Sequence, residues 1–168
     1  EAIRRLVALG ALEMTPTRRI TVARMTPAKL EEIGEARIPL EPQLAVRALK
    51  RVEGKPKMRE ALVAKLSRID EKLDAAIAQG DVGAYSKINS QFHFTLYEAA
   101  ASPVLLSIVE SLWLQIGPFM RVVLTRIGAA DLVDQHKEAL EALAAGDAEK
   151  LATAIRLDIT EGMRNIAA

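Results

Sequence analysis

Both histidines of the 168-residue chain lie where a helical pattern calls for hydrocarbon side chains. His93 shares an apolar stripe with Asn89, and the spacing of four residues places the two side chains one turn apart on a common helix face. His136 and Asp158 occupy equivalent positions on two later apolar stripes. Burying an unpaired polar group costs on the order of a few kcal/mol, so we expect these four side chains to contact one another.

Imidazole, amide and carboxylate groups from separate helices could together bind Zn²⁺ or another divalent first-row ion. The alternative is structural, because a single histidine on an apolar stripe is often a core residue that is hydrogen-bonded to a carbonyl group. The chain has no cysteine, which excludes disulfides and thiolate metal ligands and agrees with a reducing compartment such as the cytoplasm. The pattern leaves both interpretations open.

The elements that must position these residues are helices, because abundant Ala and Leu accompany 27% charged residues. Thr26 is a suitable N-cap, and Pro27 suits the first helical position. From there the periodicity predicts helices at 27–38, 41–53, 57–79, 82–101, 103–116, 118–127, 129–145 and 147–166. Pro39 and Pro42 are expected to break or kink the first pair. Short loops join the rest, which predicts an all-α fold, an antiparallel helical bundle.

The N-terminal segment follows a different plan, with a helix, a strand, a basic turn and a second strand. Gly10 is expected to end the first helix. The predicted elements are the helix 1–9 and the strands 11–14 and 20–23, with a proline-containing turn between the strands. This order is that of the wing of a winged helix-turn-helix domain. We therefore predict a C-terminal fragment of such a DNA-binding domain at 1–25 and a helical domain at 26–168.

Charge is distributed unevenly between these two predicted domains. Residues 1–24 carry five Arg against two Glu, whereas the remainder carries 18 basic against 20 acidic residues. Such asymmetry is expected where only one end of a protein meets a polyanion. The arginines suited to phosphate or base contacts are Arg4, Arg5, Arg18 and Arg19. No stretch approaches 18 consecutive apolar residues and no signal peptide is visible, so we expect a cytoplasmic protein with no membrane partner.

Short motifs with known counterparts follow one another along the chain. They are Glu1–Leu12, Thr17–Ala23, Glu35-Ala-Arg-Ile-Pro-Leu-Glu41, Asn89-Ser-Gln-Phe-His93, Gln135–Leu140, Ala144–Glu149 and Arg156-Leu-Asp-Ile159. In this order they resemble the end of the recognition helix, the wing and the sensor domain of GntR-type regulators with a FadR-like ligand-binding domain, the FCD domain. The resemblance covers essentially the whole chain.

The resemblance implies a divalent metal at the centre of the helical domain. The family often binds the ion with Asp, His, His and His, and the corresponding positions here are Asn89, His93, His136 and Asp158. Asn in place of Asp removes one charge, and Asp in place of His restores it. Zn²⁺ is expected first, with Ni²⁺ or Mn²⁺ as alternatives, and a small organic acid as effector on the open metal positions. The competing interpretation is a metal-free pocket in which Asn89 and Asp158 hydrogen-bond the two imidazoles.

Two arginines are candidates for binding the carboxylate of such an effector. Arg37 lies in the motif that opens the sensor domain, and Arg121 follows Gly117-Pro118. A guanidinium group can bind a carboxylate through two parallel hydrogen bonds. The alternatives are an i, i+4 salt bridge between Arg37 and Glu41, and surface solvation for Arg121.

The resemblance implies a protein that is not an enzyme but a homodimeric repressor, which binds operator DNA and responds to a small organic acid. A metal-dependent helical-bundle enzyme acting on a small carboxylate is a second class, although the pattern offers no obvious general base or activated nucleophile. A structural dimerisation module is a third. Neither alternative requires the basic, wing-like N-terminal segment.

Overall fold

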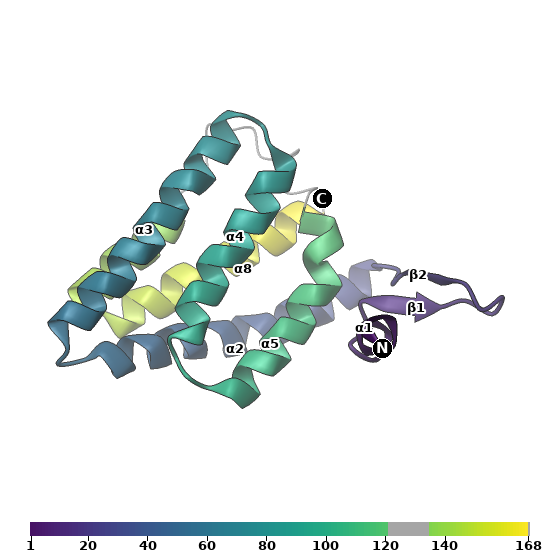
Figure 1. Ribbon diagram of the computed structural model, residues 1–168, viewed down its shortest axis with the longest axis horizontal. Coiled ribbons are helices and arrows are strands. Elements are labelled where there is room, and N and C mark those ends of the chain that lie inside the picture. Colours follow the sequence, from purple (N-terminus) through teal and green to yellow (C-terminus); the bar gives the residue numbers. More distant parts are fainter. Residues whose placement is uncertain (121–134, 168) are drawn as a thin grey trace.

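The computed structural model describes residues 1–120 and 135–167, which form a helical bundle with a small N-terminal module, residues 1–25, projecting from one end (Figure 1). The helices of the bundle are α2 (Pro27–Val52), α3 (Pro56–Ala78), α4 (Val82–Glu98), α5 (Pro103–Ile116), α7 (Gln135–Ala145) and α8 (Ala148–Ala167). The predicted all-α fold class is thus confirmed. No helix of the described ranges is both long enough and apolar enough to cross a bilayer.

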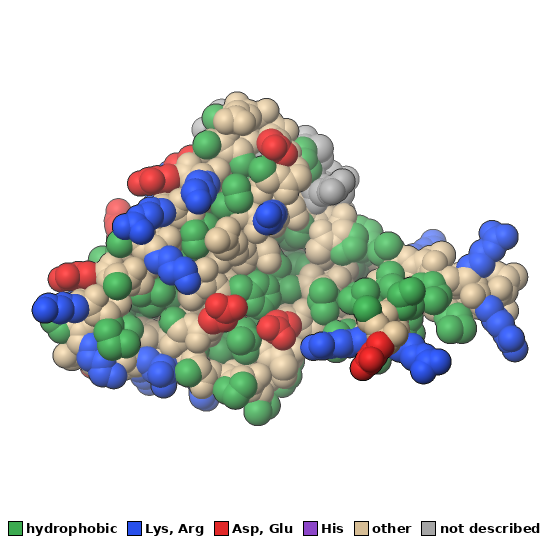
Figure 2. Space-filling view, in the orientation of Figure 1, with side chains coloured by type: hydrophobic (Ala, Val, Ile, Leu, Met, Phe, Trp, Pro, Cys, Tyr) green, Lys and Arg blue, Asp and Glu red, His purple; other side chains and the backbone are tan. Residues whose placement is uncertain are grey.

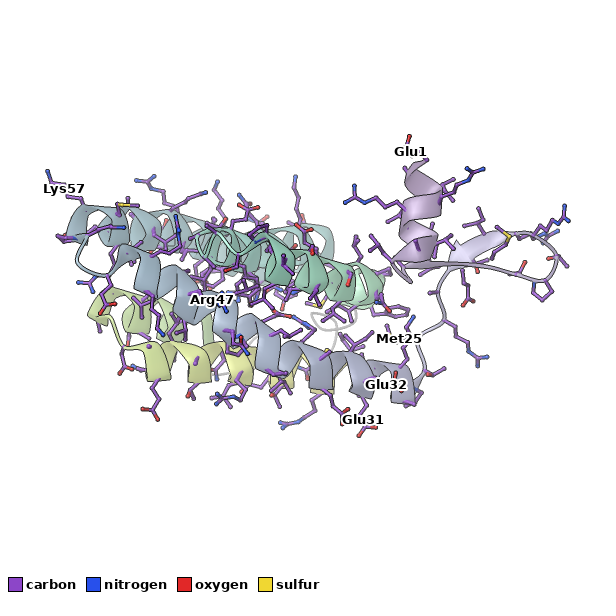
Figure 3. The ribbon with its side chains drawn as sticks, turned by 90° about the horizontal axis from the view of Figure 1, so that it is seen from below. Glu1, Met25, Glu31, Glu32, Arg47 and Lys57 are labelled. Atoms are coloured by element: carbon purple, nitrogen blue, oxygen red, sulfur yellow. The ribbon has the colours of Figure 1, made fainter. Side chains whose placement is uncertain are left out.

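The bundle has two sides that enclose one hydrophobic core. Helix α2 packs against α8, α5 and α4, and α3 packs against α4 and α7. In the turned view, α7 and α8 lie on the opposite side of the bundle from α4 and α5 (Figure 3). The largest fully buried apolar side chains come from all of these helices and include Leu44, Leu66, Phe92, Leu96, Ile116, Leu143 and Leu151.

Helix α2 is continuous from Pro27 to Val52, which corrects the expectation that Pro39 and Pro42 separate two helices. The buried positions continue through both prolines on one stripe, namely Leu30, Ile33, Gly34, Arg37, Glu41, Pro42, Leu44, Ala45, Ala48, Leu49 and Val52. Pro39 itself is exposed, so water can bind the carbonyl group that the missing amide leaves unpaired. Packing of the stripe against neighbouring helices therefore outweighs the loss of backbone hydrogen bonds.

The predicted helices 57–79, 82–101, 103–116 and 147–166 agree with α3, α4, α5 and α8 to within a few residues. The predicted range 103–116 matches α5, and Thr26 caps α2 by accepting a hydrogen bond from the Lys29 amide at 3.2 Å. A 3₁₀ turn, η1 (Gly117–Phe119), begins where the helix 118–127 was predicted. Residues 121–127 of that prediction, and residues 129–134 of the predicted helix 129–145, lie outside the described residues.

The N-terminal module has the predicted order of helix, strand, turn and strand. It consists of α1 (Ala2–Ala8) and an antiparallel hairpin of β1 (Leu12–Met14) and β2 (Ile20–Val22). Gly10 ends the helix with a φ of +73°, a conformation that glycine adopts without steric cost. The amides of Gly10 and Ala11 donate to carbonyl groups of α1, which is the hydrogen-bond pattern of a Schellman motif.

Candidate metal centre

Three residues that the sequence places on separate apolar stripes meet at the centre of the bundle. His93 comes from α4, His136 from α7 and Asp158 from α8. Each offers one ligand atom, and these atoms all lie within 4.8 Å of one another. Both histidines are buried, and Asp158, with a side chain that is 26% exposed, is the least buried member of this cluster.

The spacing of the ligand atoms suits a single metal ion. The Nε2 atoms of His93 and His136 are 3.2 Å apart. Two nitrogen ligands at 2.0–2.1 Å from a tetrahedral zinc ion would be about 3.3 Å apart. The Asp158 carboxylate lies 3.1 Å from His93 Nε2 through Oδ2 and 3.6 Å from His136 Nε2 through Oδ1. These three groups therefore fit a divalent cation without requiring a large rearrangement.

Electrostatics also favours a cation between these groups. Burial by itself would raise the pKa of Asp158, but the neighbouring His93, His136 and Arg37 lower that pKa to about 2. Asp158 is therefore ionised at neutral pH. A carboxylate and two Nε2 lone pairs would repel one another at these distances, so a shared proton or a metal ion must lie among them.

His93 is held from behind by a hydrogen-bonded chain that leads to α2. Its Nδ1 lies 3.1 Å from the Tyr97 hydroxyl, which donates a hydrogen bond of 2.7 Å to Oε2 of Glu41. Burial and the Glu41 carboxylate both raise the pKa of Tyr97, so the phenol keeps its proton. The two nitrogens of His93 thus have separate neighbours, with Nε2 facing the cluster and Nδ1 facing Tyr97.

His136 is supported by an aromatic ring and a second buried carboxylate. The Phe92 ring stacks on the imidazole with a centroid distance of 4.0 Å and an interplanar angle of 12°. Asp70 of α3 places Oδ1 3.3 Å from His136 Nδ1. This oxygen is buried and accepts no hydrogen bond of good geometry from the described residues. Oδ1 of Asp70 therefore faces the imidazole and has no hydrogen bond from the part of the chain that the structure describes.

Glu41 is a fully buried carboxylate that accepts hydrogen bonds from three helices. Arg37 donates through Nε and Nη2, Trp113 donates through Nε1 at 3.1 Å, and Tyr97 completes the set. The Arg37 guanidinium also lies 4.6 Å from the centre of the Trp113 ring. Burial opposes the charge of Arg37, but Glu41 more than compensates and raises the pKa of the guanidinium. This network connects α2, α4 and α5 directly behind the cluster.

The structure places the other predicted site residues as follows. Asn89 is buried on α4, one turn before His93. Arg37 forms the salt bridge with Glu41 that was the alternative to effector binding. Arg121 lies outside the described residues. The four arginines predicted to contact DNA are all exposed on the N-terminal module: Arg4, Arg5, Arg18 and Arg19. Figure 2 shows cationic side chains at the tip of this projecting module.

Sequence reasoning missed Asp70, Tyr97 and Trp113. Asp70 carried a usable signal, because it lies on an apolar stripe of its helix between Leu66 and Leu73, as the predicted site residues do on theirs. Tyr97 also follows His93 at the i, i+4 spacing. No pattern along the chain pairs Trp113 with a carboxylate 72 residues earlier.

A cavity of about 650 Å³ lies between the N-terminal module and helices α4 and α5. Its lining includes Leu6, Leu12 and Val22 from the module and Phe94 and Trp113 from the bundle. Trp113 thus borders this cavity while its Nε1 donates to Glu41. One side chain therefore contacts both the network behind the cluster and the space beside the module.

The sequence matches a known domain family and a curated protein. Residues 32–161 match the family model described as the FCD domain. The HTH-type transcriptional regulator McbR of Escherichia coli (strain K12) is 29% identical over 152 residues, which are 89% of this chain and 66% of that protein. The chain therefore spans just under two thirds of the length of this curated relative.

Solved structures agree with the family match. The structure of E. coli McbR/YncC superposes with a TM-score of 0.84 at 26% identity, covering 98% of this chain and 81% of that one. A GntR-family transcriptional regulator from Pseudomonas syringae pv. tomato str. DC3000 superposes with a TM-score of 0.69 at 21% identity, covering 99% of this chain and 67% of that one. The second similarity concerns the fold alone.

Proposed function

The chain belongs to the FCD domain family of GntR-type regulators, and from this premise we propose that it is part of a ligand-responsive transcription regulator. The observation that carries the proposal is the convergence of His93, His136 and Asp158 at the centre of the bundle that matches the family. We assign the protein the role of a cytoplasmic repressor and no enzymatic activity. The curated relative is a transcription regulator, which favours this class over a metal-dependent enzyme or a purely structural dimerisation module.

In this proposal, Asn89, His93, His136 and Asp158 hold a divalent metal ion, with Zn²⁺ favoured over Ni²⁺ and Mn²⁺. Nitrogen ligands with one carboxylate suit zinc. When bound, the ion would supply a Lewis-acidic site for the carboxylate oxygens of a small organic acid. Asp158 contributes the negative charge of the ligand set, because its carboxylate lies 3.1 Å from His93 and 3.6 Å from His136.

Arg37 and Arg121 remain the proposed cationic partners of the effector. For Arg37 the role has a cost, because Glu41 already occupies Nε and Nη2, and Nη1 lies 3.5 Å from the Met163 sulfur. An acid could still bind the remaining Nη1 and Nη2 protons, because a guanidinium has five N–H donors, but Nη1 would then have to give up its contact with Met163. The structure therefore gives more support to Arg37 as an organiser of the site than as a direct ligand.

The proposed output is DNA binding by a homodimer through a complete winged domain. Residues 1–25 would be the C-terminal part of that winged domain, and residues 26–168 would be the sensor domain. The exposed arginines of the N-terminal module would contact operator phosphates or bases. The module is connected to the sensor at Met25, which lies where the hairpin ends and α2 begins (Figure 3). Glu41 lies on α2, and Trp113 borders the cavity beside the module. Both belong to the hydrogen-bonded network behind His93, so a change at the metal centre can reach the module through them. The coupling requires only 1–3 kcal/mol, as is typical of allosteric systems.

The decisive experiment combines metal analysis with a thermal-shift screen of organic acids. We expect purified wild-type protein to contain about one divalent ion per chain, consistent with a structural donor set of this kind. At least one acid should raise Tm in the wild type but not in His93→Ala. Asp74→Asn is the control, because the Asp74 side chain on α3 is 49% exposed and its substitution leaves the centre unchanged. Absence of bound metal together with no response to any acid would contradict the sensor proposal.

A further inference from the structure

The hydrogen-bonded chain behind His93 decides which of its nitrogens carries the proton. The Tyr97 hydroxyl has a single proton and donates it to Glu41, so its oxygen can only accept from His93 Nδ1. Glu41 is an acceptor by necessity, because two donors of Arg37 and the Trp113 indole already point at its carboxylate. A proton on His93 Nδ1 is therefore fixed by Tyr97, and Nε2 is the nitrogen that faces Asp158 and His136, where it can bind a metal ion or, without one, share a proton with Asp158.

For His136, the proton on Nδ1 is favoured by a carboxylate on another helix, Asp70 of α3. The Asp70 carboxylate is buried, and its Oδ1 lies 3.3 Å from His136 Nδ1 without accepting a hydrogen bond from the described residues. A negative charge beside Nδ1 favours a proton on that nitrogen. Stacking on Phe92 restricts rotation of the ring away from this arrangement. Nε2 of His136 then faces His93 and Asp158.

We infer that Glu41, acting through Tyr97, and Asp70 are positioning residues that keep a proton on Nδ1 of His93 and of His136, so that both Nε2 atoms are available as metal ligands. Carboxylates that orient metal-binding histidines in this way raise the affinity of the site. The inference deepens the proposed function and rests on it for the metal measurement. It also makes a prediction about the imidazoles that can be tested without metal.

The first test is nuclear magnetic resonance of protein labelled with ¹⁵N-histidine, with and without zinc. In the wild type we expect Nδ1 of His93 to carry a hydrogen-bonded, slowly exchanging proton in both states. Tyr97→Phe removes the acceptor while retaining the ring, so this proton should exchange faster and the metal-free imidazole should populate the other tautomer. Ser86→Ala is the control, since it removes a partly buried hydroxyl from the same helix and no contact between Ser86 and His93 is described.

The second test is zinc affinity, measured by competition with a chromophoric chelator. Tyr97→Phe and Asp70→Asn should each weaken zinc binding by about 10- to 100-fold, the range found for outer-shell partners of metal ligands. Asp74→Asn is the control for Asp70, because Asp74 is one turn away on α3 and also contacts α7, through an exposed ion pair with Lys137. Its zinc affinity should stay within about twofold of the wild type, as for other surface changes.

The outcomes separate this inference from the proposed function. If wild-type protein binds no zinc, the metal part of the proposed function is wrong. The position of the Nδ1 protons in the metal-free protein would still test the inference. Unchanged zinc affinity and an unchanged Nδ1 proton in Tyr97→Phe would overturn the role of Tyr97 and Glu41. Circular dichroism checks that each variant folds. Should Tyr97→Phe fail to fold, Asp70→Asn tests the same principle at His136.

Discussion

The buried centre of the bundle and the exposed N-terminal module use the same residue type in opposite ways. Arg37 is only 4% exposed, and its guanidinium is committed to Glu41 and Trp113. Arg18 and Arg19 are exposed at the turn of the hairpin. A buried charge must be paired inside the protein, whereas an exposed one stays available to a polyanion. The comparison indicates that the charge at the centre is used within the protein, whereas the charge on the module remains accessible from outside.

The largest effect should come from removing the acceptor at the centre of the buried network. Glu41→Ala leaves the Arg37 guanidinium, the Tyr97 hydroxyl and the Trp113 indole without their shared partner. We expect a loss of about 3–5 kcal/mol in the free energy of unfolding, measured by urea denaturation. Glu35→Ala, an exposed change on the same helix, should stay within about 0.5 kcal/mol. Similar losses in both variants would break the contrast between buried and exposed charge.

Metal binding should produce the next largest effect. At a free zinc concentration one hundred times its Kd, wild-type protein should gain about 2.7 kcal/mol of stability, because the ion binds only the folded state. His93→Ala removes a ligand atom and should lose this gain. The measurement is urea denaturation with and without zinc. An equal gain in His93→Ala would show that zinc binds elsewhere, for example at exposed carboxylates.

Acidity should test the charge of Asp158 in the metal-free protein. Its pKa is lowered from 3.8 to about 2 in the folded state, so its contribution of about 2 kcal/mol is present above pH 4. That contribution is lost as the pH falls from about 4 to about 2, because the unfolded chain binds the proton first. Asp158→Asn should lack this part of the pH dependence in denaturation curves. Identical slopes for the two proteins over this window would contradict a partnered, ionised Asp158.

The smallest effect on stability is expected at the tip of the N-terminal module. Arg19→Ala should change the free energy of unfolding by less than about 0.5 kcal/mol, because the side chain is exposed. In a protein with a complete winged domain, the same variant should reduce the dependence of log K on log salt for operator binding by about one unit. Arg68→Ala, an exposed change on α3, is the control and should leave the salt dependence unchanged. Equal salt dependences for Arg19→Ala and the wild type would show that Arg19, in the turn of the module, does not contact DNA.

Local sequence by itself determined the helical fold, the hairpin module and three residues of the cluster. His93, His136 and Asp158 could be identified because a polar side chain on an apolar stripe is visible in the periodicity of one helix. The capping pair Thr26-Pro27 and the Gly10 stop could be identified because backbone conformation at these residues is set locally.

Only the tertiary structure decided that α2 runs through Pro39 and Pro42, because packing against neighbouring helices outweighs a local backbone cost. It also decided what surrounds each charged group. Glu41 and Trp113 are 72 residues apart, and Asp70 meets His136 from a different helix, so their pairing depends on how helices pack. Propensity and spacing describe a single helix, whereas the partners of a buried charge come from its neighbours in space.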